Sequence, residues 1–404
     1  MSTSFLYHSS KVQGVIYEKT IYEKDRIIFR VKPKESLFVC SKCESTHVVR
    51  NGGSERLIRN LKIGRKTTFI QIYQSRLRCK DCHSSCMMEL PFVEKWKNYT
   101  RAVALEAWDL SRAMTLKDVA DYLGMDWRAV KDIQKEKLKT KYERPSLKNL
   151  ENIGIDEICI GKGHKYITVV IDLDSGRVIY MEKGKNSSSL NPFWKRLRRS
   201  KARVKAVAID MSPAYISAVK YHLPDATIVF DHFHVIKLFN EKLSAFRRAL
   251  YHHLPDSEKK DVLKGSRWLL LKNPENLTEK HDEHNRLERA LELNSSLSKV
   301  CYMKEELRQI WRQDSKKEAR KMLNLWVKQA EESKVPMLRK FAYRLLAYRN
   351  SILSYYDNKL SSGPVEAFNN KIKTIQRQAY GYRDQEFFRL KVFSSHEAKF
   401  KLVG

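Results

Sequence analysis

The 404-residue sequence lacks any uninterrupted apolar run of the roughly 18 to 20 residues that a membrane-spanning helix needs. Its first residues, MSTSFLYHSSKVQ, also lack the charged start, apolar centre and small-residue cleavage site of a signal peptide. Apolar residues nevertheless make up 42% of the chain, so substantial hydrophobic cores can form. We therefore expect a soluble intracellular protein of roughly two to four domains, without a membrane partner.

Acidic residues are scarce relative to basic ones. The chain has 47 Asp and Glu against 78 Lys and Arg, which gives a formal net charge of +31. Such a surface attracts polyanions, and nucleic acid is the commonest of these because cationic side chains release its counterions. The basic residues run through every region rather than beside one amphipathic anchor, which disfavours a membrane surface. A charge that serves only solubility is the remaining alternative.

Cysteines are few and odd in number, with five of the seven between residues 40 and 86. An odd count in an intracellular chain argues against a disulfide framework. Cys40 and Cys43 form a CSKC knuckle, and Cys79 and Cys82 form a CKDC knuckle. Two such knuckles predict a tetrahedral Zn²⁺ site, which is structural because four protein ligands leave no open position.

The interval between the knuckles is longer than in a minimal zinc ribbon, so we expect long strands between them. The ribbon-like domain is predicted to span residues 36–92, after an N-terminal arm at residues 1–35. Two nearby side chains, His83 and Cys86, are alternative zinc ligands. Reduced cysteines that bind no metal are the other interpretation.

The segment TLKDVADYLGMDWRAVKDIQKEKL has helical apolar spacing on both sides of Gly124, which permits a sharp turn. With a preceding helix, it predicts a helix-turn-helix domain at residues 95–138. An ordinary three-helix linker is the alternative, because the pattern is short. A charged, proline-containing linker is expected at residues 139–149. The second helix would present three cations to the major groove of double-stranded DNA: Arg128, Lys131 and Lys135.

Residues 150–237 change to the pattern of an α/β unit. NIGIDEICIG, HKYITVVIDL and RVIYMEKG predict three strands, a basic helix follows, and VKAVAID and ATIVFD predict two more strands around a short helix. This order is that of a ribonuclease H-like fold, in which the first and fourth strands are neighbours. Their adjacency would bring Asp156 and Asp210 together, and convergent carboxylates are what Mg²⁺ binds.

Glycine is nearly absent from residues 238–355, where Gly265 is the single example among many Leu, Lys, Glu and Arg. This composition predicts a helical insertion. Its three tryptophans are expected in the core, and stacking on a flipped base is the alternative role. They are Trp268, Trp311 and Trp326.

Residues 356–404 are expected to complete the core. In SGPVEAFNNKIK, helical spacing places Glu366, Lys373 and Arg377 on a polar face, opposite an apolar one. A carboxylate followed by cations suits a metal ligand and phosphate contacts on a helix that faces DNA. A solvated amphipathic helix is the alternative. The predicted fold class is thus multidomain α/β. A ribonuclease H-like catalytic core with a helical insertion is preceded in the chain by a zinc ribbon-like domain and a helix-turn-helix domain.

Four motifs, GIDE, AIDMSPAY, FDHFHVIKL and SGPVEAFNNKIKTIQRQAYGYRD, resemble those of the DDE-type insertion-sequence transposases, closest to the ISL-three group. The resemblance covers nearly the whole chain. Its one departure is SSG ahead of PVE, where similar proteins often carry asparagine before the glycine; the glutamate assignment stands.

The resemblance implies that Asp156, Asp210 and Glu366 are a catalytic triad that holds two Mg²⁺ ions, with Mn²⁺ as the alternative ion. It implies DNA strand cleavage and strand transfer at one site, acting on terminal inverted repeats and a target duplex. It further implies a homodimer or higher multimer on paired ends, cytoplasmic and nucleoid-associated in a bacterium.

Other residues near these motifs are expected to support the site or to contact DNA. Support would come from Asp231, His234 and Lys237, with Asp231 an alternative metal ligand, and Arg383 would contact DNA near Arg377. Two other functions stay open, namely a DNA-binding regulator with an inactive core and a ribonuclease H-like structure-specific nuclease. The terminal repeat, the target preference and the transposition pathway have no signal in the sequence.

Overall fold

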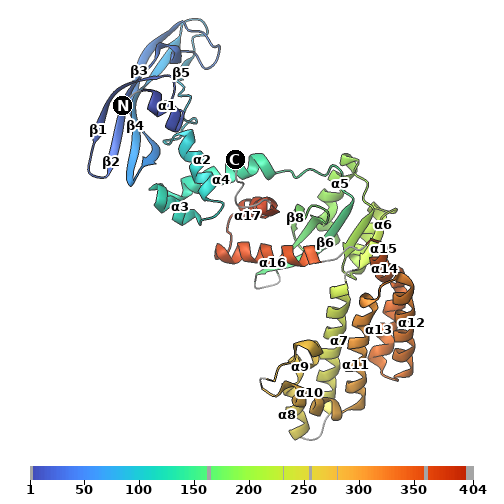
Figure 1. Ribbon diagram of the computed structural model, residues 1–404. Coiled ribbons are helices and arrows are strands. Elements are labelled where there is room, and N and C mark those ends of the chain that lie inside the picture. Colours follow the sequence, from blue (N-terminus) through green and yellow to red (C-terminus); the bar gives the residue numbers. More distant parts are fainter. Residues whose placement is uncertain are drawn as a thin grey trace. The chain divides into compact units, whose positions relative to one another are not determined.

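The computed structural model describes residues 3–161, 165–230, 232–253, 257–279, 281–358 and 363–396 (Figure 1). These residues form two compact units, one ending at Glu143 and the other comprising Arg144–His396. Within the described residues, no helix is both long enough and apolar enough to cross a membrane.

The first unit contains a five-stranded sheet of order β1-β2-β4-β3, with β5 paired to β4. Helix α1 (Thr3–Ser10) packs against it through Leu6, which is buried with Phe29 and Ile70. Strand β1 pairs with β2, and β2 is a parallel neighbour of β4, so Val15–Tyr22 and Arg26–Pro33 belong to this sheet rather than to the separate N-terminal arm expected from the sequence. The apolar run in RIIFRVKP explains the difference, because an extended segment with such a run needs a sheet in which to bury its side chains. The strands are β1 (Val15–Tyr22), β2 (Arg26–Pro33), β3 (Val48–Ile63), β4 (Lys66–Cys79) and β5 (Ser85–Met87).

Three helices with their own small core complete this unit: α2 (Arg101–Leu110), α3 (Leu116–Leu123) and α4 (Trp127–Tyr142). Gly124 has φ +64 at the end of α3, the left-handed conformation expected of a tight turn between helices. Helix α4 continues to Tyr142, past the expected linker boundary, because Leu138 and Tyr142 extend its buried face.

The second unit is built on a five-stranded sheet of order β10-β9-β6-β7-β8. The first three strands along the chain form an antiparallel meander, and β9 and β10 add to it in parallel. The predicted adjacency of the first and fourth strands is confirmed, because β6 pairs with β9. The elements are β6 (Asn152–Gly161), β7 (Lys165–Asp172), β8 (Arg177–Lys183), α5 (Asn191–Ser200), β9 (Ala206–Ile209), α6 (Pro213–His222) and β10 (Thr227–Phe230).

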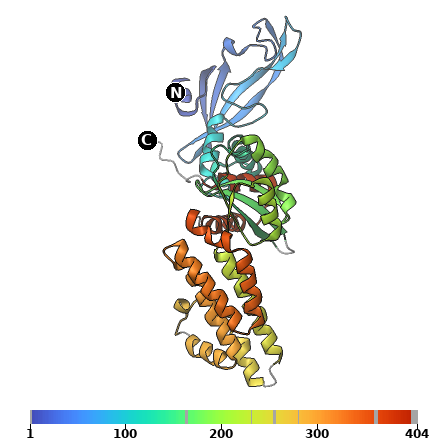
Figure 2. The ribbon, with the colours of Figure 1, turned by 90° about the vertical axis from the view of Figure 1, so that its right-hand side faces the viewer.

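A helical bundle follows β10, coloured yellow-green to orange in Figures 1 and 2. It begins with α7 at His232 rather than near residue 238, and α7, α11, α12 and α13 pack on one another. The helices are α7 (His232–His253), α8 (Ser257–Gly265), α9 (Arg267–Leu271), α10 (Glu283–Glu292), α11 (Ser295–Gln309), α12 (Lys316–Glu332), α13 (Pro336–Ala347), α14 (Arg349–Leu353) and α15 (Tyr355–Asn358).

The three tryptophans of this bundle differ in burial. Trp326 is fully buried and Trp311 packs partly buried against the core, as expected. Trp268 is 67% exposed, so its predicted place in the core is wrong. The physical reason is the shortness of α9, whose neighbours Leu269 and Leu270 already fill its buried side.

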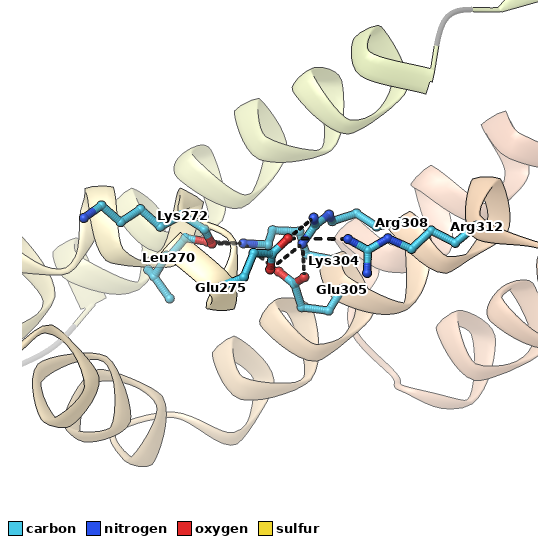
Figure 3. A network of polar contacts seen from close by, with 7 residues as sticks. All are labelled: Leu270, Lys272, Glu275, Lys304, Glu305, Arg308 and Arg312. Atoms are coloured by element: carbon cyan, nitrogen blue, oxygen red, sulfur yellow. Dashed lines mark hydrogen bonds and ion pairs between the residues drawn. The ribbon is translucent and has the colours of Figure 1, made fainter. Parts of the chain in front are cut away.

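A buried lysine joins two parts of the bundle (Figure 3). Lys304 of α11 is 2% exposed, and its Nζ donates to the carbonyl oxygens of Leu270 at 2.9 Å and Lys272 at 2.7 Å. It also pairs with Glu305, which in turn binds Arg308. The end of α9 is thereby fixed to α11.

Two final helices return to the sheet of the second unit. Helix α16 (Gly363–Gln378) packs on β6, and α17 (Gln385–Phe393) packs against β8. Ile372, fully buried, lies on the apolar face of α16 that the sequence predicts. The chain therefore leaves the sheet after β10, forms the helical insertion, and comes back to the central strand.

Candidate active site and zinc-binding cysteines

The four knuckle cysteines converge in the first unit. Ligand sulfur atoms of Cys40, Cys43, Cys79 and Cys82 all lie within 4.8 Å of one another. Because β3 and β4 form a long hairpin whose far end pairs Val48 with Cys79, the two knuckles meet despite the long interval between them. Four sulfur atoms at this spacing fit a tetrahedral Zn²⁺ ion.

Without a bound metal, the surroundings favour the thiolate form of Cys40 and Cys82, whereas the neighbouring cysteine side chains raise the pKa of Cys43 to about 12. The hydroxyl of Ser84 lies 3.4 Å from Cys40 Sγ and 2.9 Å from Cys82 Sγ. Its hydrogen bond lowers the pKa of the Cys40 thiol to about 5, and it also lowers the pKa of Cys82. Thiolate is the form that binds zinc. Neither alternative ligand belongs to the cluster, since His83 is exposed and Cys86 lies on β5, where it pairs with Leu77.

Asp156 and Asp210 lie on neighbouring strands of the second unit. The parallel register pairs Asn152 with Ala206 and Gly154 with Ala208, so two residues further on Asp156 is level with Asp210. Side chains alternate along a strand, so both project from the face that carries Gly154, opposite the one buried by Ile153. The sequence separates them widely, and the register brings them side by side.

Both aspartates are half-buried, and the resolved electrostatic effect falls on Asp210. Burial raises the pKa of Asp210, and the negative charge of Asp156 raises it further. A hydrogen bond from the Ser212 backbone N–H, together with His234 and Lys237, acts in the opposite direction. Both α7 side chains, placed near the site by the sequence, thus act on Asp210. Asp231 lies outside the described residues.

Glu157 belongs to the other face of β6. Burial raises its pKa, and a hydrogen bond with the Tyr215 side chain of α6 lowers it. Tyr215 is itself part of the hydrophobic core on that face. The alternation expected from the sequence therefore separates Glu157 from the carboxylate of Asp156, although their charges still interact.

Helix α16 reaches Asp156 through a residue that the sequence interpretation missed. Asn369 Nδ2 donates to Asp156 Oδ2 at 2.5 Å, and near the other end of the helix Gln376 Nε2 donates to the carbonyl of Ile160. Asn369 follows Glu366 by three residues, so the two share one side of the helix. That spacing could have indicated Asn369 from the sequence. The neighbouring Asn370 fits the same polar face, however, and in the structure it is exposed.

Glu366 itself is exposed in the first turn of α16. In the parts of the chain that the structure describes, only the four cysteines form a His, Cys, Asp and Glu group whose ligand atoms all lie within 4.8 Å of one another. At least one pair among the carboxylates of Asp156, Asp210 and Glu366 is therefore further apart than that. Glu366 lies one helical turn before Asn369, the residue of α16 that contacts Asp156.

The site also holds an oxygen suited to a hard cation. Asn369 Oδ1 is buried and has no hydrogen-bond partner among the described residues. Carboxylate and amide oxygens are the ligands that Mg²⁺ and Mn²⁺ take in proteins. The donor set of Asp156, Asp210 and this amide fits such an ion.

The expected DNA contacts fall in both units. Arg128 is exposed on α4, with Lys131 and Lys135 half-buried along the same helix. In the second unit Lys373 is half-buried on α16, and Arg377 is exposed near its end. Exposed Arg383 follows in the turn before α17.

Two family models match the chain. That of the ISL3-type DDE transposases, described as a transposase, matches residues 153–392. A second, described as the zinc finger of the transposases of IS204, IS1001, IS1096 and IS1165, matches residues 36–82. The zinc-finger match and the four-cysteine cluster together identify a structural zinc site.

Several known transposases are similar to this chain. That of insertion sequence element IS1001 from Bordetella parapertussis is 33% identical over 386 residues, covering 94% of this chain and 95% of that protein. That of element IS1557 from Mycobacterium tuberculosis is 28% identical over 388 residues, covering 89% and 86%. The solved Drosophila P element transposase strand transfer complex has a TM-score of 0.37 and 11% identity, covering 73% of this chain and 91% of that one, too distant to support an argument. The transposase match over residues 153–392 and the similarity to the IS1001 protein establish that this chain belongs to the ISL3-type DDE transposases, enzymes that cleave DNA and transfer its strands.

Proposed function

We propose that this transposase binds the terminal inverted repeats of its own insertion sequence and cleaves and joins DNA at a site formed by Asp156, Asp210 and Glu366. The observation that carries the proposal is the register of β6 and β9, which makes the two aspartates neighbours on one face. Helix α16 packs on the same strand and carries Glu366. Each carboxylate comes from a different part of the fold, and their convergence would offer the carboxylate oxygens that a divalent metal ion binds.

The fold that supports this site is proposed to be a ribonuclease H-like core. A three-stranded antiparallel meander followed by two parallel strands on the β6 side supports that assignment. The helical insertion lies between β10 and α16, so the chain order is aspartate, aspartate, insertion, glutamate. This order is the one implied by the family resemblance.

The proposed ions are two Mg²⁺, which would activate the attacking oxygen and stabilise the leaving oxygen of a phosphodiester. Asp156 and Asp210 would hold them, with Asp156 oriented by Asn369. Three carboxylates repel one another, so a cation between them is the physical reason for Glu366 to approach the pair. His234 and Lys237 would favour the ionised form of Asp210 that a ligand needs.

DNA recognition is proposed to rest mainly on the first unit. Helix α4 follows a left-handed turn at Gly124 and presents Arg128, Lys131 and Lys135, as the second helix of a helix-turn-helix would. The zinc ribbon is tied to these helices, because Arg59 of β3 donates to the carbonyl of Leu123. We further propose that Lys373, Arg377 and Arg383 contact phosphates near the cleavage site, in a multimer assembled on paired ends.

A strand-transfer assay with DNA that carries the element ends, a target plasmid and Mg²⁺ tests this function. Joined products are expected from the unchanged protein, and Asp210→Asn should remove both cleavage and joining. Asp225→Asn, which changes an exposed aspartate between α6 and β10, is the matched control and should retain both. Cleavage without joining would instead indicate a nuclease, and DNA retention without turnover a regulator. Full joining by Asp210→Asn would refute the metal assignment.

A further inference from the structure

Asn369 links α16 to a carboxylate of the proposed site through a side-chain hydrogen bond. Its Nδ2 donates to Asp156 Oδ2 at 2.5 Å, across 213 residues of sequence. A hydrogen bond to an ionised acceptor is stronger and shorter than a neutral one. The contact fixes the orientation of the Asp156 carboxylate, which already accepts from the Glu157 backbone N–H through its other oxygen at 2.7 Å.

The hydrogen bond of Nδ2 does not explain the position of the other polar atom of this amide, Oδ1. Asn369 Oδ1 is buried, and among the described residues it has no hydrogen-bond partner. A buried acceptor without a partner is unfavourable, and native structures usually provide one in protein, water or an ion. Because both atoms belong to one planar amide, Oδ1 lies close to the carboxylate that Nδ2 contacts.

We propose that Asn369 is a fourth residue of the divalent-cation site, in which Nδ2 orients Asp156 and Oδ1 provides a neutral oxygen ligand. Hard cations take amide oxygens together with carboxylates. A neutral ligand also adds an oxygen without increasing the repulsion among Asp156, Asp210 and Glu366. This inference rests on the proposed function, which places the cation at those carboxylates.

A purely structural role for Asn369 makes a different prediction, and Gln376 separates the two. Gln376 lies two turns further along α16 and donates to the carbonyl of Ile160, so it also anchors the helix on β6. It does not contact a carboxylate in that hydrogen bond. Gln376→Leu therefore removes an anchor of the same kind and leaves the proposed ligand in place.

The test is a titration of the full-length protein with Mn²⁺ in the absence of DNA. The electron paramagnetic resonance signal of free Mn²⁺ measures how much of the ion is bound. Asn369→Leu is expected to weaken binding about tenfold, the lower end of what loss of a supporting metal-site residue costs. Asn369→Asp keeps an oxygen ligand but loses the donor to Asp156 and adds a negative charge, so it should bind Mn²⁺ more tightly than Asn369→Leu does. Gln376→Leu should bind like the unchanged protein. The cysteine cluster does not compete, because thiolates are poor ligands for Mn²⁺.

Three outcomes would overturn the inference: unchanged Mn²⁺ affinity in Asn369→Leu, an equal loss in both leucine variants, or no measurable binding by the unchanged protein. Thermal unfolding of each variant shows whether a loss of affinity reflects a loss of folding. If Asn369→Leu does not fold, the Mn²⁺ affinity of Asn369→Asp decides whether an oxygen at this position binds the ion. Asp156→Asn and Asp210→Asn report on the proposed function separately. If those two bind Mn²⁺ normally, the carboxylate site itself is wrong; if they lose binding while Asn369→Leu keeps it, only the role of Asn369 fails.

Discussion

Replacing Lys304 with methionine should destabilise the helical insertion by about 2–4 kcal/mol. Methionine keeps the buried apolar stem of the lysine but removes its donors to the carbonyls of Leu270 and Lys272. Each carbonyl left without a partner in a buried position costs roughly 1–3 kcal/mol. Glu305 Oε1 also loses its 2.9 Å ion pair with Lys304, while Oε2 keeps its 2.6 Å contact with Arg308. Burying an ammonium group is itself unfavourable, so its removal offsets part of the lost stability.

Urea denaturation of the full chain, with hydrogen exchange resolved along the sequence, measures this effect. Exchange should accelerate first at residues 267–279, because the lost contacts fix the end of α9 to α11 (Figure 3). Lys299→Met alters an exposed lysine on the same helix and should change stability by less than about 0.5 kcal/mol. Equal stability of the two variants, with unchanged exchange at residues 267–279, would refute the assigned role of Lys304.

Three other predictions concern zinc, pH and backbone geometry. Cys43→Ser should abolish stoichiometric zinc, measured by elemental analysis, and make residues 36–92 sensitive to limited proteolysis; retained zinc would contradict the cluster. Burial raises the pKa of Asp210, so its protonated form stabilises the fold at low pH and that contribution disappears as pH rises through the raised pKa. Asp210→Asn should therefore be more stable than the unchanged chain at pH 7 without added Mg²⁺, with the difference vanishing near about pH 4 in urea titrations. Gly124→Ala should cost about 1–2 kcal/mol in thermal unfolding, since φ is +64 and its Cβ would lie 2.8 Å from Arg59 Nη2; an unchanged melting temperature would contradict that strain.

Much of the second unit could be predicted because its signals are local. Short apolar runs bounded by turn residues gave all five strands, and their order implied that the strands of Asp156 and Asp210 are neighbours. The helix of Glu366 followed from its apolar period, with Ile372 buried as expected. The cysteine knuckles were equally local, and only the long hairpin was needed to bring them together.

The contacts that sequence reasoning missed depend on tertiary register. Asn369 touches Asp156 only because α16 lies on β6 at one particular position along the strand, which no local pattern encodes. Lys304 is buried although lysine is normally exposed, because two carbonyls at the end of a short helix receive it. Trp268 shows the opposite difference: it is expected in the core but is exposed, because its neighbouring leucines already fill the core side of α9.

The position of α16 in the chain also has a consequence for protein synthesis. Asp156 and Asp210 leave the ribosome early, whereas the helix that carries Glu366 is made only after the whole helical insertion. At about 5–20 residues per second, that insertion delays completion of the proposed site by on the order of ten seconds. A nascent or prematurely terminated chain would already contain the zinc ribbon and the helices proposed to bind DNA, but would lack Glu366. Under the proposed function, such fragments would occupy element ends without cutting them, so incomplete translation products are expected to act as competitors of the intact transposase.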